Sequence, residues 1–196
     1  MEPSPLMALV DPPTMANQPC LRLITLHYER FWLLIEIRKL PVSRWKDMRR
    51  LRLESLRESP LAFGSTVGED YALKESEWKK RMRGAYFALA DDVPVGMIVC
   101  SFNKDVKFRH IAEIYSFYVR AGARGKGIGS GLLGKALQMA RKKKDVVKVR
   151  LYVNNQQRTA LRMYFKTGFE VVGTLKREMK VGGRFYTMLV MEKRIR

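Results

Sequence analysis

The sequence is poor in the residues that build metal and thiol sites. Its 196 residues include two cysteines, Cys20 and Cys100, and two histidines, His27 and His110. Two cysteines at this separation make no disulfide framework and have no metal-ligand spacing. The widely separated histidines offer no zinc site and no Cys–His catalytic pair. Because Cys100 lies in an apolar run, we expect it to be a small buried hydrophobe. The sequence therefore predicts no bound metal and no cysteine nucleophile.

Long apolar runs are also missing. The stretch "FWLLIEI", residues 31–37, is short and contains Glu36, whereas a membrane-spanning helix needs roughly 20 apolar residues. The first residues lack the basic segment and apolar core of a secretion signal. We therefore predict a soluble, cytoplasmic protein without a membrane partner.

Acidic residues are few in relation to basic ones. The chain has 38 lysines and arginines against 19 acidic residues, a net charge of +19. Such a surplus favours anionic partners: phosphates, acidic polypeptides, nucleic acid or a membrane surface. The basic residues are spread along the chain, and no recognised DNA- or RNA-binding motif is present. A basic nucleic-acid-binding module stays an alternative, but we do not expect nucleic acid to be the partner.

The apolar content and the hydrophobic patterns predict one folded domain. Hydrophobic residues make up 46% of the chain, enough for a real core. We expect a proline-rich N-terminal extension over residues 1–30, which need not be ordered, and the domain over 31–196. Periodicity and turn residues predict the order β-α-α-β-β-β-α-β-α-β-β. The predicted strands cover 31–40, 85–90, 96–102, 110–119, 146–153, 169–179 and 184–195, and the predicted helices cover 43–59, 75–82, 130–144 and 156–168.

The stretch "RAGARGKGIGS", residues 120–130, stands between a predicted strand and a predicted helix. The first amides of a helix have no intrahelical acceptors, and the helix dipole places partial positive charge there. Glycines allow close backbone approach, while Arg124 and Lys126 add charge-assisted hydrogen bonds. A chain reversal alone would need a single glycine. The pattern therefore predicts a phosphate or pyrophosphate site.

Two familiar phosphate-binding patterns fit this stretch poorly. In a P-loop counted from Gly122, the lysine position is occupied by Ile128. A G-x-G-x-x-G pattern exists at Gly129, Gly131 and Gly134, but it begins beyond the strand and no acidic residue stands about 20 positions onward. A nucleotide-binding oxidoreductase is therefore the weaker alternative. We expect Gly131 and Gly134 to be helix-packing positions instead.

The pattern that fits is R-x-x-G-x-G at Arg124, Gly127 and Gly129. Here the sequence resembles the GNAT superfamily of acetyl-CoA-dependent N-acyltransferases, whose pyrophosphate loop has the form Q/R-x-x-G-x-G/A. A second signature of that family, roughly L-x-V, then N-x-x-A-x-x-L-Y and G-F, is similar to residues 151–170. The matching positions are Leu151, Val153, Ala160, Tyr164, Gly168 and Phe169. The family's asparagine and its leucine before the tyrosine are Gln157 and Met163 here. The resemblance covers residue 32 to the end.

The resemblance implies an α/β (α+β) fold with a mixed, mostly antiparallel central sheet of six to seven strands and about four helices. It also implies transfer of an acetyl group from acetyl-CoA, a co-substrate, directly to a primary amine, without a metal. Strand backbone would pair with the pantetheine arm of CoA, and the glycine loop would hold the pyrophosphate. The implied cofactor-binding residues are Phe117, Tyr118, Val119, Arg124, Gly125, Lys126, Gly127, Ile128, Gly129, Ser130, Gln157 and Tyr164.

Two residues are implied as catalytic. Tyr164 stands where the family places the acid that protonates the leaving thiolate, although a tyrosine there could also simply pack its helix. Glu113, on the strand that enters the site, stands where some members place the base. The connection over residues 59–71 offers Glu69 and Asp70 as other carboxylates, and Glu113 could equally be a surface residue of an alternating strand.

The acceptor amine lies outside both motifs. In this fold it would enter between residues 59–71 and the closing hairpin at 181–186. Many family members carry an acidic residue after the aromatic residue of the last strand, but here Thr187 follows Tyr186. We expect the acceptor to be a protein N-terminus or lysine, or alternatively a small amine or amino-acid-like molecule, and a homodimer is compatible with the sequence. The basic surface disfavours polyamines, which carry like charge.

Overall fold

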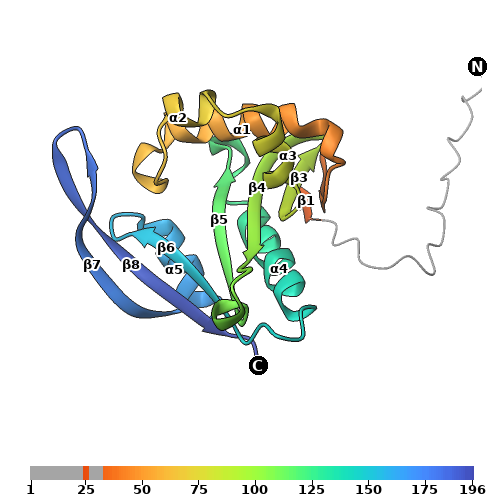
Figure 1. Ribbon diagram of the computed structural model, residues 1–196. Coiled ribbons are helices and arrows are strands. Elements are labelled where there is room, and N and C mark those ends of the chain that lie inside the picture. Colours follow the sequence, from red (N-terminus) through yellow and green to blue (C-terminus); the bar gives the residue numbers. More distant parts are fainter. Residues whose placement is uncertain (1–23, 27–32) are drawn as a thin grey trace, which may run out of the picture.

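An eight-stranded sheet organises the chain in the computed structural model, which describes residues 24–26 and 33–196. The strand order is β1-β2-β3-β4-β5-β6-β8-β7, with β5 and β6 parallel and the other described neighbours antiparallel. The strands are β1 (Ile24–Leu26), β2 (Leu33–Arg38), β3 (Ala85–Ala90), β4 (Val93–Phe102), β5 (Ile111–Val119), β6 (Lys148–Asn154), β7 (Glu170–Val181) and β8 (Arg184–Arg194). The predicted mixed, mostly antiparallel sheet is confirmed (Figure 1).

The seven predicted strands correspond to β2–β8. The additional strand, β1, has three residues and pairs with β2 at the edge of the sheet. It falls inside the predicted extension, where the sequence offers little periodicity. The rest of residues 1–30, with Cys20 and His27, lies outside the described residues, so the domain boundary stays a prediction.

Five α-helices accompany the sheet in the described part of the chain: α1 (Trp45–Glu58), α2 (Val67–Tyr71), α3 (Glu75–Met82), α4 (Ile128–Arg141) and α5 (Arg158–Lys166). Four of them were predicted. The fifth, α2, lies within residues 59–71, which the sequence suggested to be a loop. Its five residues are too few for a visible hydrophobic period, but a capping box between Thr66 and Glu69 starts the helix. A short 3-10 helix, η2 (Pro60–Ala62), precedes it.

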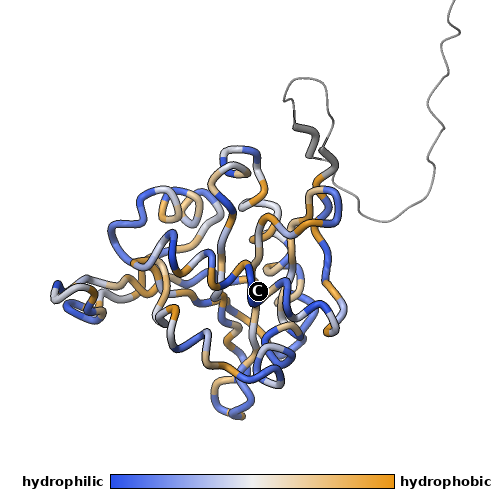
Figure 2. Tube along the Cα trace, turned by 90° about the horizontal axis from the view of Figure 1, so that it is seen from above, coloured by the Kyte–Doolittle hydropathy of each residue, from blue (hydrophilic) through white to orange (hydrophobic). Residues whose placement is uncertain are grey.

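The helices form two layers, one on each face of the sheet (Figure 1, Figure 2). On β4, Ile98 and Cys100 pack in one core with Leu132 and Leu137 of α4, to which α5 also contributes. The other core joins residues of α1, α3 and the opposite faces of β3 and β4: Met48, Leu51, Leu56, Trp78, Phe87, Met97 and Val99. Period-two alternation of the strands thus supplies both cores. Cys100 is 1% exposed, as predicted, and burial raises the pKa of its thiol to about 12.

One prediction about α4 is wrong. A Cβ atom on Gly134 would meet nothing within 4 Å, so this glycine is not a packing position. The buried face of α4 consists of Ile128, Leu132, Leu133, Ala136, Leu137 and Ala140. Gly134 is exposed and lies outside this face, because it stands two residues, about half a helical turn, from both Leu132 and Ala136.

The last two strands form an arm that projects from the body of the molecule in two perpendicular views (Figure 1, Figure 2). β7 and β8 turn at Gly182 and Gly183, both with positive φ, which confirms the predicted hairpin. Among the described residues, no helix is both long and apolar enough to span a membrane.

Candidate active site

The parallel pairing of β5 and β6 ends halfway along the two strands. It runs from Ile111 opposite Lys148 to Ile114 opposite Leu151, whereas β5 continues to Val119 and β6 to Asn154. On its other side β5 remains paired with β4 as far as Val119. Within the described part of the chain, the β6-facing backbone groups of residues 115–119 therefore have no strand partner. Such an edge can pair with an extended, amide-containing ligand.

A bulge in β5 shapes this edge. Val99 of β4 lies opposite Tyr115 and Met97 lies opposite Tyr118, so Ser116 and Phe117 together face a single residue of β4. Ser116 has a φ of 50°, which is unusual for a residue with a side chain. The extra residue sends Phe117 toward the α4 core and Tyr118 into the α1–α3 core.

The glycine stretch forms the turn from β5 into α4. Gly125 and Gly127 have φ angles of 76° and 77°, in the left-handed region that glycine tolerates, and Gly127 is the N-cap of α4. The N–H of Gly131 bonds to the carbonyl of Gly127. The amides of Ile128, Gly129 and Ser130 precede this first bond of the helix. They supply the donors and the positive dipole end that an anion needs.

The side chain of Arg124 is already engaged. Its Nε donates to the carbonyl of Val119 at 2.8 Å, and its Nη2 pairs with Glu58 at the end of α1. Glu58 also accepts from the Tyr118 hydroxyl, so it joins α1 to both β5 and the loop. Arg124 therefore fixes the shape of the loop, a contribution that its place in the motif did not reveal.

Three segments far apart in the sequence meet around Gly129. A Cβ atom at this position would lie 3.3 Å from the sulfur of Met163 and 3.6 Å from the ring of Phe117. The Phe117 ring in turn lies 6.3 Å from the ring of Tyr164, centroid to centroid, and the Tyr164 ring lies 5.8 Å from that of Phe169. The end of β5, the first turn of α4 and α5 thus converge, and Gly129 leaves the space that lets them do so.

Tyr164 is 6% exposed, and its burial raises the pKa of the phenol above its ordinary value. A raised pKa keeps the phenol protonated at neutral pH, the form in which it can donate a proton. Packing and function do not exclude each other here, because the ring packs in the core with α4 and the transferable proton is on the hydroxyl. Gln157 stands at the N-cap of the same helix, where its backbone carbonyl accepts from Leu161, without a capping bond from its side chain.

Glu113 lies on the face of β5 opposite the α4 core. Its neighbours Ala112 and Ile114 belong to that core, whereas Glu113 alternates away from it and is level with Arg150 of β6. Arg150 pairs with Glu192 of β8 at 2.6 Å, and Lys148 pairs with the same carboxylate at 2.9 Å. Burial raises the pKa of Glu192, but the two hydrogen-bonded cations outweigh it and lower the pKa overall. Glu113 is thus on a different face of the sheet from Tyr164, one residue before the strands separate.

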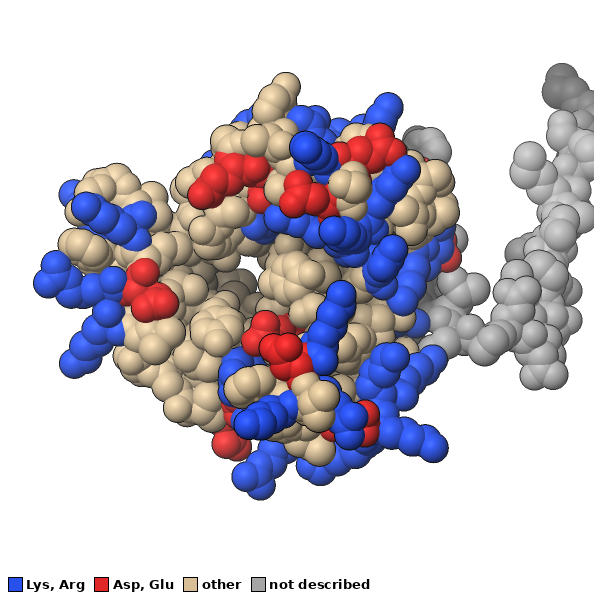
Figure 3. All heavy atoms as spheres, in the orientation of Figure 1, with Lys and Arg blue, Asp and Glu red and all other residues tan. Residues whose placement is uncertain are grey.

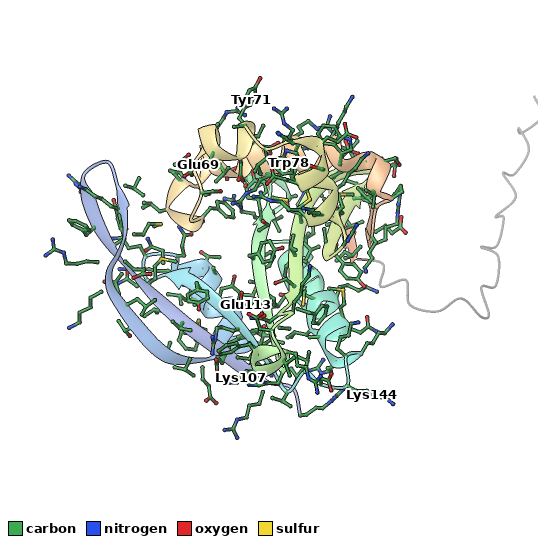
Figure 4. The ribbon with its side chains drawn as sticks, in the orientation of Figure 1. Glu69, Tyr71, Trp78, Lys107, Glu113 and Lys144 are labelled. Atoms are coloured by element: carbon green, nitrogen blue, oxygen red, sulfur yellow. The ribbon has the colours of Figure 1, made fainter. Side chains whose placement is uncertain are left out.

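The two carboxylates of the α1–α2 connection have structural partners. Asp70 is 1% exposed and accepts from Arg52 at 2.7 Å and from Arg81 at 3.3 Å. Glu69 accepts from the backbone and hydroxyl of Thr66, and these bonds lower the pKa of Glu69. Figure 4 shows Glu69 on α2, well apart from Glu113 on β5. The buried ion pair makes Asp70 unsuitable as a base that exchanges protons with a substrate.

Sequence reasoning missed three residues at the opening between β5 and β6. Tyr115 and Tyr152 are 42% and 48% exposed, and strand alternation places them on the same face as Glu113 and Arg150. Asn154, at the end of β6, is 1% exposed; its Oδ1 accepts the N–H of Gln156 while its Nδ2 has no partner. The tyrosines could have been found from their spacing of two residues after Glu113 and Arg150. No sequence signal identifies Asn154.

A hollow lies beside this opening. The space-filling view in Figure 3 shows it between the α1–α2 part of the molecule and the β7–β8 arm. The free edge of residues 115–119 leads from the point where β5 and β6 separate to the N-terminal loop of α4.

Comparisons with known proteins support the resemblance to the acetyltransferase family. A family model described as the acetyltransferase (GNAT) family matches residues 45–169. An uncharacterised N-acetyltransferase of Methanocaldococcus jannaschii is 30% identical over 122 residues, which cover 56% of this chain and 54% of the relative. The chain thus spans about half the length of that curated relative.

Solved structures resemble the whole fold at low identity. A GNAT-family acetyltransferase from Streptococcus pneumoniae aligns with a TM-score of 0.73 and 20% identity, over 83% of this chain and 99% of its own. A putative acetyltransferase from Salmonella typhimurium, solved with its cofactor acetyl-CoA, gives 0.72 and 16%, over 83% and 94%. A ribosomal-protein-alanine N-acetyltransferase from Brucella melitensis gives 0.68 and 24%, over 82% and 99%. These identities support a shared fold and no finer assignment.

Proposed function

The chain belongs to the GNAT family of acetyltransferases, and from this premise we propose that it transfers an acetyl group from acetyl-CoA directly to a primary amine. One observation carries the proposal: the unpaired end of β5, the R-x-x-G-x-G loop and α5 converge around Phe117, Gly129 and Tyr164. A phosphate-binding turn, an edge for amide pairing and a buried phenol are the three parts that a thioester of CoA requires.

The pyrophosphate of CoA binds at the start of α4. The amides of Ile128, Gly129 and Ser130 donate to its oxygens, and the backbone of residues 125–127 wraps around it. Lys126 adds positive charge. Arg124 holds the loop against Val119 and Glu58. The pantetheine arm then lies along the free edge of Phe117, Tyr118 and Val119, and Gln157 and Tyr164 complete the site from α5.

The acetyl carbonyl lies where β5 and β6 separate. The amine nitrogen attacks the thioester carbon, so that an N–C bond forms and negative charge develops on the carbonyl oxygen. A backbone N–H of the bulged segment of β5 donates to that oxygen. The C–S bond then breaks, and the thiolate takes the proton of Tyr164. The proton lost by the amine goes to Glu113, directly or through a water, on the opposite face of the sheet.

The acceptor is a polypeptide amine, an N-terminus or a lysine. The hollow between α1–α2 and the arm is open in Figure 3. Tyr115 and Tyr152 are exposed and stand on β5 and β6 just past the last paired residues. An open, aromatic-lined approach suits an extended chain better than a closed pocket of drug-like size would. A small amine or an amino-acid-like molecule is the second candidate, because the same two tyrosine rings could pack against the side group of a small acceptor.

Turnover against an acceptor panel tests the proposal. Release of free thiol from acetyl-CoA is followed with small amines, amino acids and peptides that offer an N-terminus or a lysine. We expect activity with peptides and none with the small amines. Activity with a small amine alone would show that the acceptor is a small molecule and not a polypeptide. Thermal stabilisation by acetyl-CoA but not by NAD(H) separates the transferase from a nucleotide-binding oxidoreductase.

A further inference from the structure

We propose that the tip of the β7–β8 arm, residues 176–186, binds an acidic stretch of the polypeptide acceptor beyond its reactive amine. This inference rests on the proposed function and specifies its substrate class. Four observations carry it: the charge of the tip, an exposed ring that organises the charge, a bulge that aims it, and the position of the tip beside the hollow.

The tip is strongly and one-sidedly charged. It carries four exposed cations, Lys176, Arg177, Lys180 and Arg184, against the single anion Glu178. Basic side chains gather on the arm in Figure 3. Like charges held together on two strands repel each other, and the arrangement becomes favourable when an anion lies between them.

An exposed aromatic ring holds two of these cations in place. Phe185 is 47% exposed, although exposure of a large apolar side chain to water is energetically unfavourable. The Arg177 guanidinium lies 4.4 Å from its ring centroid and the Lys180 ammonium lies 5.4 Å from it. The ring thus reduces the rotamer freedom of both cations before any partner binds, which lowers the entropy cost of binding.

A bulge in β7 creates this cluster. Leu175 lies opposite Met188 and Met179 opposite Tyr186, so residues 176–178 face only Thr187. Arg177 has a φ of 56°, in the left-handed region where non-glycine residues are strained. A regular β-hairpin without a bulge would not require a positive φ at this strand position. Bulges and strained residues of this kind occur where a side chain is aimed at a partner.

The tip begins next to the proposed reaction site. The N–H of Asn155, just past the end of β6, donates to the carbonyl of Thr187, which directly follows the tip. The base of the tip is thereby tied to the strand end that borders the hollow. Strand residues advance roughly 3.3 Å each, so the cations lie about two to five residues along an extended acceptor from its amine.

An acidic polypeptide fits these features better than other anions do. The hollow is open in Figure 3, and spaced carboxylates can meet cations on both strands of the tip. A nucleic acid would also be attracted, but its binding would not depend on an amine in the hollow and would weaken steeply with salt. Nucleic-acid binding at the tip is therefore an outcome that overturns the proposal.

The test uses the full chain and pairs of peptides with the same N-terminal residue. One peptide of a pair has Glu or Asp at positions two to five, and the other has Gln or Asn there. Two or three partly exposed ion pairs predict a KM lower by on the order of tenfold for the acidic peptide, with kcat unchanged. The double variant Arg177→Glu/Lys180→Glu removes this preference and leaves turnover of the neutral peptide intact.

A matched control separates docking from the general charge of the molecule. Lys143 and Lys144 follow α4 on the other side of the molecule from the arm, where Figure 4 labels Lys144, and the Lys143 ammonium lies 5.6 Å from the ring of Phe102. The variant Lys143→Glu/Lys144→Glu makes the same change in net charge and is expected to keep the preference. Loss of the preference in both double variants contradicts docking at the tip.

Fluorescence anisotropy of labelled peptides gives a second readout that does not require turnover. Tighter binding of the acidic peptide, lost in the arm variant and kept in the control, supports the proposal. Equal binding of acidic and neutral peptides overturns it, as does an RNA oligonucleotide that binds the tip more tightly than the acidic peptide. If neither peptides nor small amines are acetylated, the proposed function fails. If peptides are acetylated without regard to acidic residues, only the docking site fails.

Discussion

The two sides of the separated strands are built by different means. The proposed cofactor side, formed by the end of β5, residues 120–130 and α5, depends on backbone: left-handed glycines, free helix amides and an unpaired strand edge. The proposed acceptor side, formed by the α1–α2 connection and the β7–β8 arm, depends on charged side chains and their partners: Arg52 and Arg81 with Asp70, and Arg177 over the ring of Phe185. Backbone features that bind a ligand shared by a whole family are encoded in short sequence motifs. Charged side chains can be exchanged one by one as the acceptor changes from member to member.

The largest effect is expected on the acceptor side. Asp70→Ala removes the carboxylate that pairs with Arg52 at 2.7 Å, and Arg52 is itself buried. An unpaired buried charge remains, so we expect a loss of about 3–5 kcal/mol in the free energy of unfolding. Urea unfolding measures it. The double variant Arg52→Met/Asp70→Leu leaves no charge behind and is expected to recover most of the loss; equal losses in both variants would contradict this explanation.

On the cofactor side, the largest effect is expected at Tyr164. Tyr164→Phe keeps the ring in its core and removes the proposed acid, so kcat falls by roughly 100-fold or more while the KM for acetyl-CoA changes little. Burial raises the pKa of this phenol above the ordinary tyrosine value of about 10, so the phenol stays protonated to a higher pH. The alkaline loss of activity due to this group therefore lies above about pH 10. Steady-state kinetics over pH measures both.

The control is Tyr71→Phe, which changes a tyrosine of α2 that is 61% exposed. It is expected to leave kcat unchanged. A fall in kcat and a rise in the KM for acetyl-CoA together in Tyr164→Phe would indicate that Tyr164 positions the cofactor and does not act as the acid.

A smaller effect is expected at the N-cap of α4. Gly127 has a φ of 77°, and an alanine forced into the left-handed conformation is disfavoured by about 1–2 kcal/mol. Gly127→Ala is therefore expected to weaken acetyl-CoA binding by roughly fivefold to 30-fold, as the strained loop loses its shape. Calorimetric titration with acetyl-CoA measures the change. Unaltered affinity would show that the loop does not form the pyrophosphate site.

The sequence predicts the backbone features of the proposed cofactor side better than the side-chain contacts around it, for a physical reason. A positive φ at Gly127 and the free amides after it follow from a local pattern, and the apolar period of α4 is visible over its 14 residues. The bond from Arg124 to Glu58 and the orphaned amide of Asn154 depend on how distant segments pack. The strand bulges at Ser116 and Arg177 have no residue preference that identifies them, and α2 is shorter than two helical turns.

The smallest effect compares two glycines of the same loop-and-helix segment. Gly134 lies inside α4, and a Cβ atom there meets nothing within 4 Å. Alanine in a helix interior avoids the larger entropy loss of glycine, so Gly134→Ala is expected to stabilise the protein by about 0.5–1 kcal/mol. Thermal unfolding measures the gain, and kinetics should show no change in the KM for acetyl-CoA. Since Gly127→Ala and Gly134→Ala make the same chemical change seven residues apart, opposite outcomes would separate a glycine that the cofactor site requires from one that only imitates a nucleotide-binding pattern. A loss of stability in Gly134→Ala would mean that this position is packed in solution after all.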